Sequence, residues 1–388
     1  MTMLIFKWRR IALTGIKPGI LAISALLLCA AAPAAEPVSG WTPAKIERLE
    51  YWLAKAPEDA LPLLNIRPLE KALSGGDTTE TDRAATALAL RLARMHLLGC
   101  ATPAQRAGWH IADSDAHVDL HARLERAVEL NSIDAFFAGL QPKHPDYAVL
   151  REAYANEADP KRRETIARNM ERWRWMPQSP GEDYVLVNAA AFQAELWREN
   201  RHVGTWKVIV GKRSTPTPVF SAAITGVILN PWWTVPASIV REMRGRFPAS
   251  KGYVRSGGQI RQKPGPNNAL GEMKLDMPNP YTVYMHDTPA KQLFERDERA
   301  FSHGCIRVGD ALGLATTLLE RLKTREEVDA IVATRRTTTI ELQRRLPVYI
   351  AYFTAGTDDE GALTFYSDIY GRDGRVGHAA DPDRACGV

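Results

Sequence analysis

Tyr284–Pro289 reads YMHDTP and Arg299–Val308 reads RAFSHGCIRV, and these two stretches are the most informative part of this 388-residue chain. In the second stretch, Cys305 follows a glycine directly and a histidine by two positions. A cysteine acts as a nucleophile when a nearby imidazole takes its proton, because the thiolate attacks and the thiol does not. The pattern therefore predicts a catalytic cysteine at position 305.

Two histidines compete for the role of the base. A short apolar strand is predicted over Tyr281–His286, and its alternation turns Thr282, Tyr284 and His286 toward one side. His286 would then end a strand beside a loop, where its imidazole can face a cleft. His303 remains a rival, because residues i and i+2 share one face of an extended segment.

Gly304 removes side-chain bulk beside the nucleophile, so the backbone N–H groups of Gly304 and Cys305 are expected to face a developing oxyanion. Two other interpretations stay open. Cys305 alone would be taken for a buried structural thiol, and His286, His303 and Cys305 together would offer three ligands to zinc. Their spacing matches no known zinc motif. A thiolate and an imidazole suffice for the chemistry, so we predict a site without a metal or an organic cofactor.

The charge balance argues against a nucleic-acid partner. Lys and Arg number 50 and Asp and Glu number 45, which gives a net charge of +5 and a pI near 9.0. Four of the basic residues lie in the first 35 residues, which contain no acid, so the rest of the chain carries 46 against 45. A protein that binds phosphate backbones needs a concentrated basic face, and this remainder has no excess charge to build one.

Residues 1–35 have the layout of a secretory signal peptide. Positive charges precede an apolar run over 19–32, and Ala32–Ala34 (APA) sets small residues two apart. The run is short for a membrane-spanning helix, which needs roughly 20 residues, and an uncleaved anchor is the alternative. We expect export of the mature chain to the periplasm, where it would be peripheral to the envelope.

Three cysteines would remain after cleavage: Cys100, Cys305 and Cys386. An odd number in an exported protein leaves at least one free thiol. If Cys100 paired with Cys386, Cys305 would be the free one. Two lone structural cysteines are equally consistent with the sequence.

Residues 36–178 are expected to form a helical scaffold domain. Apolar residues recur there at helical spacing, and no cluster of catalytic residue types occurs. The Pro- and Gly-rich segment Met176–Gly181 marks the boundary of this domain. The expected helices of the whole chain cover Arg83–Leu98, follow Ser132 and Asp310 as N-caps, begin at Pro160, and cover Arg325–Ala333.

Residues 179–375 are expected to form a mostly β domain, so the fold class is α+β. Within this domain, 236–280 is rich in Gly, Pro, Asn and basic residues, and so long an irregular stretch is often a lid. Residues 376–388 are taken as a C-terminal tail. The expected strands are Tyr184–Val187, Phe192–Leu196, Trp206–Val210, Val219–Leu229, Tyr281–His286, Thr337–Leu342, Val348–Phe353 and Leu363–Tyr366.

The two opening stretches resemble the catalytic motif of the L,D-transpeptidase, or YkuD, family. That motif is a His, about a score of residues, then Ser/Thr-His-Gly-Cys and a basic or polar residue two further on. Here His286 precedes Cys305 by 19 positions. Further segments, in order over roughly residues 165–375, resemble the YcbB-like group of this family. These segments are Arg172–Pro177, Leu229–Pro236, Asn268–Gly271 and Asp368–Asp373.

The resemblance implies a role for each matched residue. Cys305 would be the acylated nucleophile and His286 its base. The backbone carbonyl of Asp287 would orient the imidazole, with the Asp287 carboxylate as an alternative. Arg307 would organise the site or meet a substrate carboxylate, and Tyr284 would line the oxyanion site. The candidate substrate contacts are Arg307, Tyr284, Ser302 and Trp233.

The expected function is therefore that of a peptidoglycan L,D-transpeptidase. It would act on tetrapeptide stems, release D-Ala and form 3-3 cross-links between diaminopimelate residues, with carbapenems as the expected trap. Other cell-wall synthesis proteins are further expected partners. Two alternatives stay open: a carboxypeptidase or endopeptidase in which water takes the acyl group, and a non-catalytic scaffold that binds the wall. The acceptor of a transpeptidase would be another stem, a lipoprotein lysine or a free D-amino acid.

Overall fold

Three clusters of buried hydrophobic side chains organise residues 36–376, the part of the chain that the computed structural model describes. One cluster is built from residues 38–140. A larger one spans residues 111–369 and contains the side chains between the strands. The third is small and follows the strand that ends at Leu229. The expected leader, 1–35, and nearly all of the expected tail lie outside the described residues and stay predictions.

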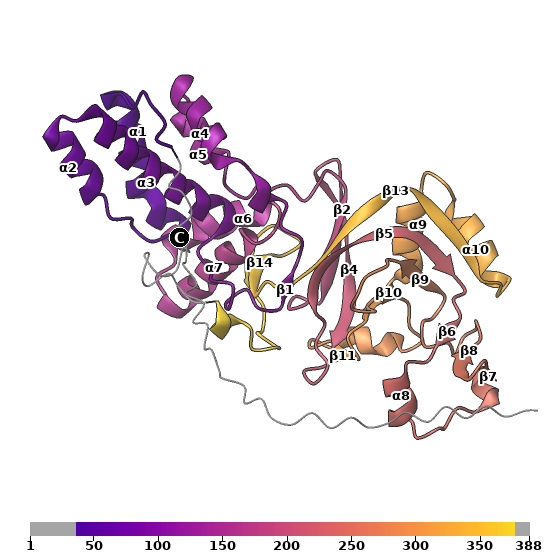
Figure 1. Ribbon diagram of the computed structural model, residues 1–388. Helices are drawn as coiled ribbons and strands as arrows, with labels where there is room; N and C mark the ends of the chain where they lie inside the picture. The colour runs from indigo at the N-terminus through magenta and orange to yellow at the C-terminus, as the bar shows by residue number, and fades with distance from the viewer. Residues whose placement is uncertain (1–35, 377–388) are drawn as a thin grey trace, which may run out of the picture. The chain divides into compact units, whose positions relative to one another are not determined.

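The N-terminal part of the described chain is helical (Figure 1). Asp77, Asp119 and Asp159 each cap a helix, because the carboxylate accepts hydrogen bonds from backbone N–H groups of the first turn. Ser132 precedes a helix without capping it, since its backbone (φ −115°, ψ 37°) lacks the extended conformation of a capping residue. The helices are α1 (Pro43–Lys55), α2 (Arg67–Gly75), α3 (Thr78–Leu98), α4 (Leu120–Glu129), α5 (Ile133–Ala138), α6 (Pro145–Asn156) and α7 (Pro160–Trp173).

The last two of these helices share a core with the strands. Tyr147 of α6 and Ile166 of α7 are buried in the larger cluster, and Trp173 stacks on Phe353 with 4.4 Å between ring centroids. The smaller core of helices α1–α5 ends before them, at Leu140. The hydrophobic core therefore changes before α6, and the domain boundary at residue 178 stays a prediction.

The strands of the main sheet close into a ring. They are β1 (Trp109–His110), β2 (Tyr184–Asn188), β3 (Gln193–Arg198), β4 (Arg201–Gly211), β5 (Val219–Leu229), β9 (Met273–Asp276), β10 (Met285–His286), β11 (Ala300–Ser302), β12 (Ile306–Val308) and β13 (Thr338–Ala351). The path β5–β13–β2–β3–β4–β12–β10–β9 returns to β5, because β9 pairs with both β10 and β5. β1 adds to β5, and β11 adds to β4.

Three expected strands differ from the structure. Residues 281–284 form a turn, because the Asn279 side-chain amide donates to the Val283 carbonyl at 2.6 Å and Thr282 takes a left-handed backbone (φ 55°). Only Met285–His286 of the expected strand is therefore extended. The strands expected at 337–342 and 348–353 are parts of one long strand, β13, whose register against β5 shifts between Glu341 and Leu346.

Two helices and a hairpin complete the β-rich part. α9 (Ala311–Leu319) begins after Asp310, whose carboxylate accepts from the Gly313 N–H at 2.9 Å, and α10 (Arg325–Ala333) begins with a capping box. Both agree with the sequence prediction. β14 (Ala355–Thr357) pairs with β15 (Leu363–Phe365). Within residues 36–376, no helix is both long enough and apolar enough to cross a membrane.

The stretch 236–280 is more ordered than its composition predicts. It contains α8 (Ala237–Glu242), and β6 (Trp233–Thr234), β7 (Tyr253–Ser256) and β8 (Gln259–Gln262) form a small sheet in the order β6–β8–β7 (Figure 1). The Gln262 amide donates to the carbonyls of Lys251 and Asn267 at 3.0 and 2.7 Å and ties the small sheet to its loops. We call α8 together with β6–β8 the cap segment. β9, at the end of the stretch, belongs instead to the main sheet.

A buried carboxylate on α7 fixes the chain that leaves α3. One oxygen of Glu171 accepts from the backbone N–H groups of Cys100 and Ala101 at 2.6 and 2.7 Å, and from the Trp175 indole N–H at 3.0 Å. The other oxygen pairs with the Arg174 guanidinium at 3.2 Å. Removal of such a buried charge leaves its partners unpaired, which is expensive.

Glu171→Gln is therefore expected to lower the free energy of unfolding by about 3–5 kcal/mol. The amide keeps the size of the side chain but removes the charge that faces Arg174 and three N–H donors. The measurement is urea unfolding followed by far-UV circular dichroism. Asp329→Asn is the matched control, because its pair with Arg325 is about half exposed and such pairs contribute about 1 kcal/mol or less. Equal effects of the two changes would contradict the argument.

Candidate active site

The pairing of two strands brings the two motif stretches together. β10 runs parallel to β12, with His286 opposite Arg307. At the first residue of β12, the Ile306 N–H donates to the Tyr284 carbonyl at 3.0 Å. Cys305 therefore lies beside Tyr284, although 20 residues separate them in the sequence.

A pocket of about 350 Å³ opens at this junction. One wall comes from the cap segment and the residues next to it, and the other comes from the motif stretches. Most of the predicted site residues line it, whereas Asp287 and Gly304 lie behind its surface. The predicted residues in the lining are Trp233, Tyr284, His286, Ser302, His303, Cys305 and Arg307.

Cys305 has a protonated thiol in the resting site. Burial raises the pKa of this thiol, although the Tyr284 N–H and hydroxyl, the Lys274 ammonium and Arg307 all favour the thiolate. The thiol itself lies 3.9 Å from the Thr282 carbonyl. A thiolate formed at this position would therefore be met by two hydrogen-bond donors of Tyr284.

Cys305 is the free cysteine among the described residues. Cys100 is disulfide-bonded, which excludes the interpretation of Cys100 as a lone structural thiol. Cys386 lies outside the described residues, so its pairing with Cys100 stays a prediction.

His286 carries a neutral imidazole. Its Nδ1–H donates to the backbone carbonyl of Asp287, and a carbonyl only accepts, so Nε2 carries the free lone pair. Burial and then Arg307 lower the pKa of His286 to about 3, against the raising effect of the Asp287 carbonyl. The imidazole is therefore uncharged near pH 7 and can accept a proton at Nε2.

Asp287 orients His286 through its backbone and not through its carboxylate. The carboxylate turns away and accepts from the Glu272 N–H at 2.9 Å, and it pairs with Lys291. Gly271 has a left-handed backbone (φ 59°), and a Cβ there would lie 2.2 Å from the Asp287 carboxylate. Glycine at 271 is thus what lets this carboxylate lie against the backbone.

Hydrogen bonds within the loop before Cys305 fix its conformation. The Ser302 hydroxyl donates to the Cys305 carbonyl at 2.5 Å and accepts from the Gly304 N–H at 3.0 Å. The Gly304 N–H is therefore engaged, unlike the free oxyanion donor that the sequence predicts. Both bonds of the buried Ser302 hydroxyl are internal and shape the loop, and its contact with substrate stays a prediction.

His303 faces the cap segment and not the nucleophile. Its Nε2 lies 2.8 Å from the Glu242 carboxylate of α8 and 3.4 Å from the Lys212 ammonium. Gly304 has φ +111°, so the segment is not extended and the rule that i and i+2 share a face fails here. No three His, Cys, Asp or Glu side chains within residues 36–376 are grouped as a metal site requires.

The structure adds Lys274, which the sequence analysis misses. It lies on β9 directly opposite His286, and its ammonium stands 4.3 Å from the centre of the Tyr284 ring. A charged residue between the buried Met273 and Leu275 is the sequence signal for a strand with one polar face. The sequence does not say which strand this face adjoins.

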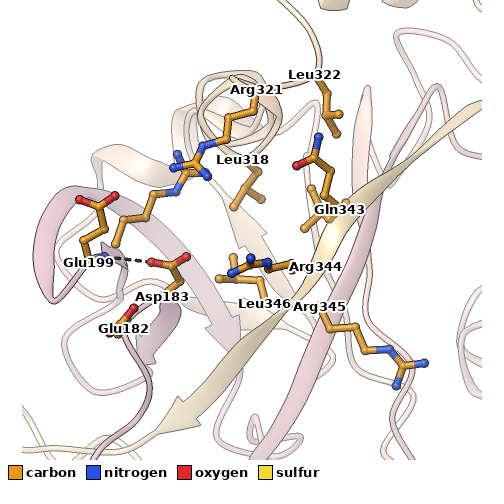
Figure 2. A pocket seen from close by; sticks show the side chains of 12 residues that line it. Glu182, Asp183, Glu199, Leu318, Arg321, Leu322, Gln343, Arg344, Arg345 and Leu346 are labelled. Atoms are coloured by element: carbon orange, nitrogen blue, oxygen red, sulfur yellow. Dashed lines mark hydrogen bonds between the residues drawn. The ribbon is translucent and has the colours of Figure 1, made fainter.

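A second pocket, of about 420 Å³, lies between the β3–β4 turn, α9 and the middle of β13 (Figure 2). Its charged residues include Asp183, Glu199, Arg321 and Arg344, and Figure 2 shows Arg344 directed toward Asp183. It has no cysteine, histidine or other predicted site residue in its lining. Without a nucleophile or an imidazole it is not the candidate site, although it is the larger of the two.

Comparison with known proteins agrees with this geometry. Residues 182–349 match the family model of the L,D-transpeptidase catalytic domain, YkuD, and residues 39–153 match that of the Scaffold domain. A putative L,D-transpeptidase of Haemophilus influenzae is 28% identical over 240 residues, which are 54% of this chain and 48% of that protein. The chain thus spans about half the length of this curated relative.

The similarity of this chain to solved structures is weaker than its similarity to the curated relative. An L,D-transpeptidase from Mycobacterium smegmatis is 12% identical, with 44% of this chain and 58% of that chain covered and a TM-score of 0.25. L,D-transpeptidase 3 from Mycobacterium tuberculosis, with a faropenem-derived adduct, is 14% identical, with 44% and 60% covered and the same TM-score of 0.25. The domain assignment does not depend on them. The chain thus carries a Scaffold domain followed by an L,D-transpeptidase catalytic domain of the YkuD type.

Proposed function

We propose that this protein is a peptidoglycan L,D-transpeptidase that forms 3-3 cross-links through a thioester on Cys305. One observation carries the proposal: a thiol and a neutral imidazole with a free Nε2 line the same pocket of a YkuD domain. The substrate is a tetrapeptide stem whose third residue is diaminopimelate and whose fourth is D-Ala.

The first acyl transfer forms the thioester. His286 Nε2 takes the Cys305 proton while the sulfur attacks the carbonyl between diaminopimelate and D-Ala. The Tyr284 N–H and hydroxyl, which already reach the sulfur, are close to the reacting carbon and to its developing oxyanion. The tetrahedral intermediate then breaks its C–N bond, and D-Ala leaves with the proton that His286 returns to its amine.

The second acyl transfer releases the enzyme. The side-chain amine of a neighbouring diaminopimelate attacks the thioester and loses a proton to His286. The C–S bond breaks, and Cys305 leaves as a thiolate that regains this proton. If water attacks instead, the product is a tripeptide stem and the enzyme is a carboxypeptidase. The cap segment, which supplies one pocket wall, decides between the two by admitting an amine and excluding water.

Arg307 is the proposed contact for a substrate carboxylate. Its side chain lines the pocket, and its Nε is buried without a hydrogen-bond partner among residues 36–376. A buried donor without a partner is costly, and a carboxylate would satisfy it. Trp233 and Tyr284 would pack against the stem beside it.

We propose that the reaction takes place outside the inner membrane. Peptidoglycan stems occur outside the inner membrane, and the leader at 1–35 has the pattern of an export signal. We therefore place the mature protein in the periplasm. Carbapenems are proposed to acylate Cys305, and cell-wall synthesis proteins are proposed as its neighbours.

Mass spectrometry of products from disaccharide-tetrapeptide tests the reaction directly. The wild-type protein is expected to give a dimer lighter than two substrates by one D-Ala, and Cys305→Ala is expected to give none. Tripeptide monomer alone would establish the carboxypeptidase alternative. Dimer formation by Cys305→Ala would refute the nucleophile and favour a wall-binding scaffold.

The same assay distinguishes which of the two histidines, His286 or His303, acts as the base. His286→Gln is expected to slow D-Ala release by about 10²–10⁴-fold, the usual contribution of a general base. His303→Gln is expected to slow it by less than about tenfold, because His303 contacts Glu242 rather than the thiol. A reversed order would make His303 the base.

The pH dependence of alkylation tests the protonated resting thiol. Because burial raises the pKa of Cys305, its alkylation by iodoacetamide is expected to be slow at pH 7 and still rising above about pH 8.5, the ordinary thiol value. The measurement is the carboxamidomethylated Cys305 peptide, quantified by mass spectrometry beside a model thiol peptide. A plateau below pH 7 would mean that a thiolate–imidazolium pair already exists.

A further inference from the structure

One row of side chains crosses the sheet at the level of the catalytic base. Strand register places Ile209 of β4 opposite Arg307 of β12, Arg307 opposite His286 of β10, His286 opposite Lys274 of β9, and Lys274 opposite Ile228 of β5. Cross-strand partners point to the same face of a sheet. The imidazole therefore has a cation on each side and an aliphatic side chain beyond each cation.

Among residues 36–376, the Lys274 ammonium makes no ion pair with a carboxylate. It lies over the face of the Tyr284 ring, 4.3 Å from the ring centre. The side chain is half-buried between two buried hydrophobic neighbours, Met273 and Leu275. A cation over the face of an aromatic ring is attracted by the ring quadrupole, and more strongly in a partly desolvated site, so this contact fixes the orientation of the ring.

We propose that Lys274 is a positioning residue of the active site, which holds the Tyr284 ring with its hydroxyl at Cys305 and flanks His286 on the side opposite Arg307. The proposal rests on the proposed function in one respect, that Cys305 is the nucleophile. Lys274 acts through Tyr284 and His286, because it does not line the pocket where the stem would bind.

The charged groups that face His286 destabilise a protonated imidazole. Arg307 faces it from β12 and Lys274 from β9, and both lower its pKa. The Asp287 carbonyl binds Nδ1, and the Asp287 carboxylate is turned toward Glu272 and Lys291. No carboxylate among the described residues therefore compensates an imidazolium in this row.

A proton on His286 is consequently passed on readily. After Cys305 has attacked, the imidazolium between two cations is a strong acid, and the leaving amine of D-Ala is the nearest base. The same two cations favour the Cys305 thiolate, because each of them lowers the pKa of that thiol. Lys274 thus stabilises the thiolate and assists the return of the proton from His286 without touching the stem.

Lys274→Met tests the proposal, because it keeps the length of the side chain and removes its charge. Two quantities are measured in the full chain: alkylation of Cys305 by iodoacetamide between pH 6 and 10, and the titration of His286 by NMR. We expect alkylation at pH 7 to fall by about threefold to tenfold and both titrations to move to higher pH. Lys274→Arg is expected to restore most of both. Lys323→Met, at an exposed lysine that pairs with Glu327, is the matched control with no effect.

A folded Lys274→Met or, if that variant does not fold, a folded Lys274→Gln with wild-type profiles would overturn the proposal. So would a Lys274→Arg variant that behaves like Lys274→Met, since the charge would then be irrelevant. Neither measurement uses peptidoglycan. Failure here therefore leaves the transpeptidase proposal standing, whereas product formation by Cys305→Ala would remove that proposal whatever Lys274 does.

Discussion

The buried ion pair between Arg172 and Asp373 is the contact on which the active-site geometry depends. Arg172 of α7 is 1% exposed, and its guanidinium reaches the Asp373 carboxylate at 2.7 Å and the Asn169 and Thr354 side chains at 3.2 Å. Its partners come from α7, from the chain after β13 and from the C-terminal end of the described residues. A buried charge that loses its partner is costly, so this pair locks three distant segments together.

The locked C-terminal segment in turn holds the nucleophile loop. Beside Asp373, Arg372 donates to the Thr217 carbonyl at 3.0 Å, and the Tyr370 hydroxyl donates to the Gly211 carbonyl at 2.6 Å. The Thr217 hydroxyl accepts from the Gly211 N–H and donates to the Gly304 carbonyl, both at 2.9 Å. Two family-like segments that lie outside the pocket, 172–177 and 368–373, therefore support the position of Cys305 through hydrogen bonds.

The sequence predicts what is local and misses what depends on strand pairing. Cys305 and His286 share the pocket as predicted from one motif, the helix after Asp310 follows from its capping residue, and a helix forms at Arg325–Ala333 as predicted. Lys274 could not be predicted, because its place beside His286 depends on β9 pairing with β10. The expectation at 303 assumes an extended chain, whereas Gly304 is left-handed. The expectation at 304 misses the Ser302 hydroxyl, which accepts a hydrogen bond from the Gly304 N–H.

The proposed chemistry also explains why a base with so low a pKa is useful. A resting thiolate–imidazolium pair would react with any electrophile, whereas a neutral thiol and a neutral imidazole react only when a carbonyl is placed between them. The cations Arg307 and Lys274 attract the carboxylates of a stem and repel an amine that is still protonated. An acceptor amine must therefore arrive uncharged, and it gives a proton to Nε2 of His286 as it attacks. The site thus favours acyl transfer to an amine that the pocket has already positioned.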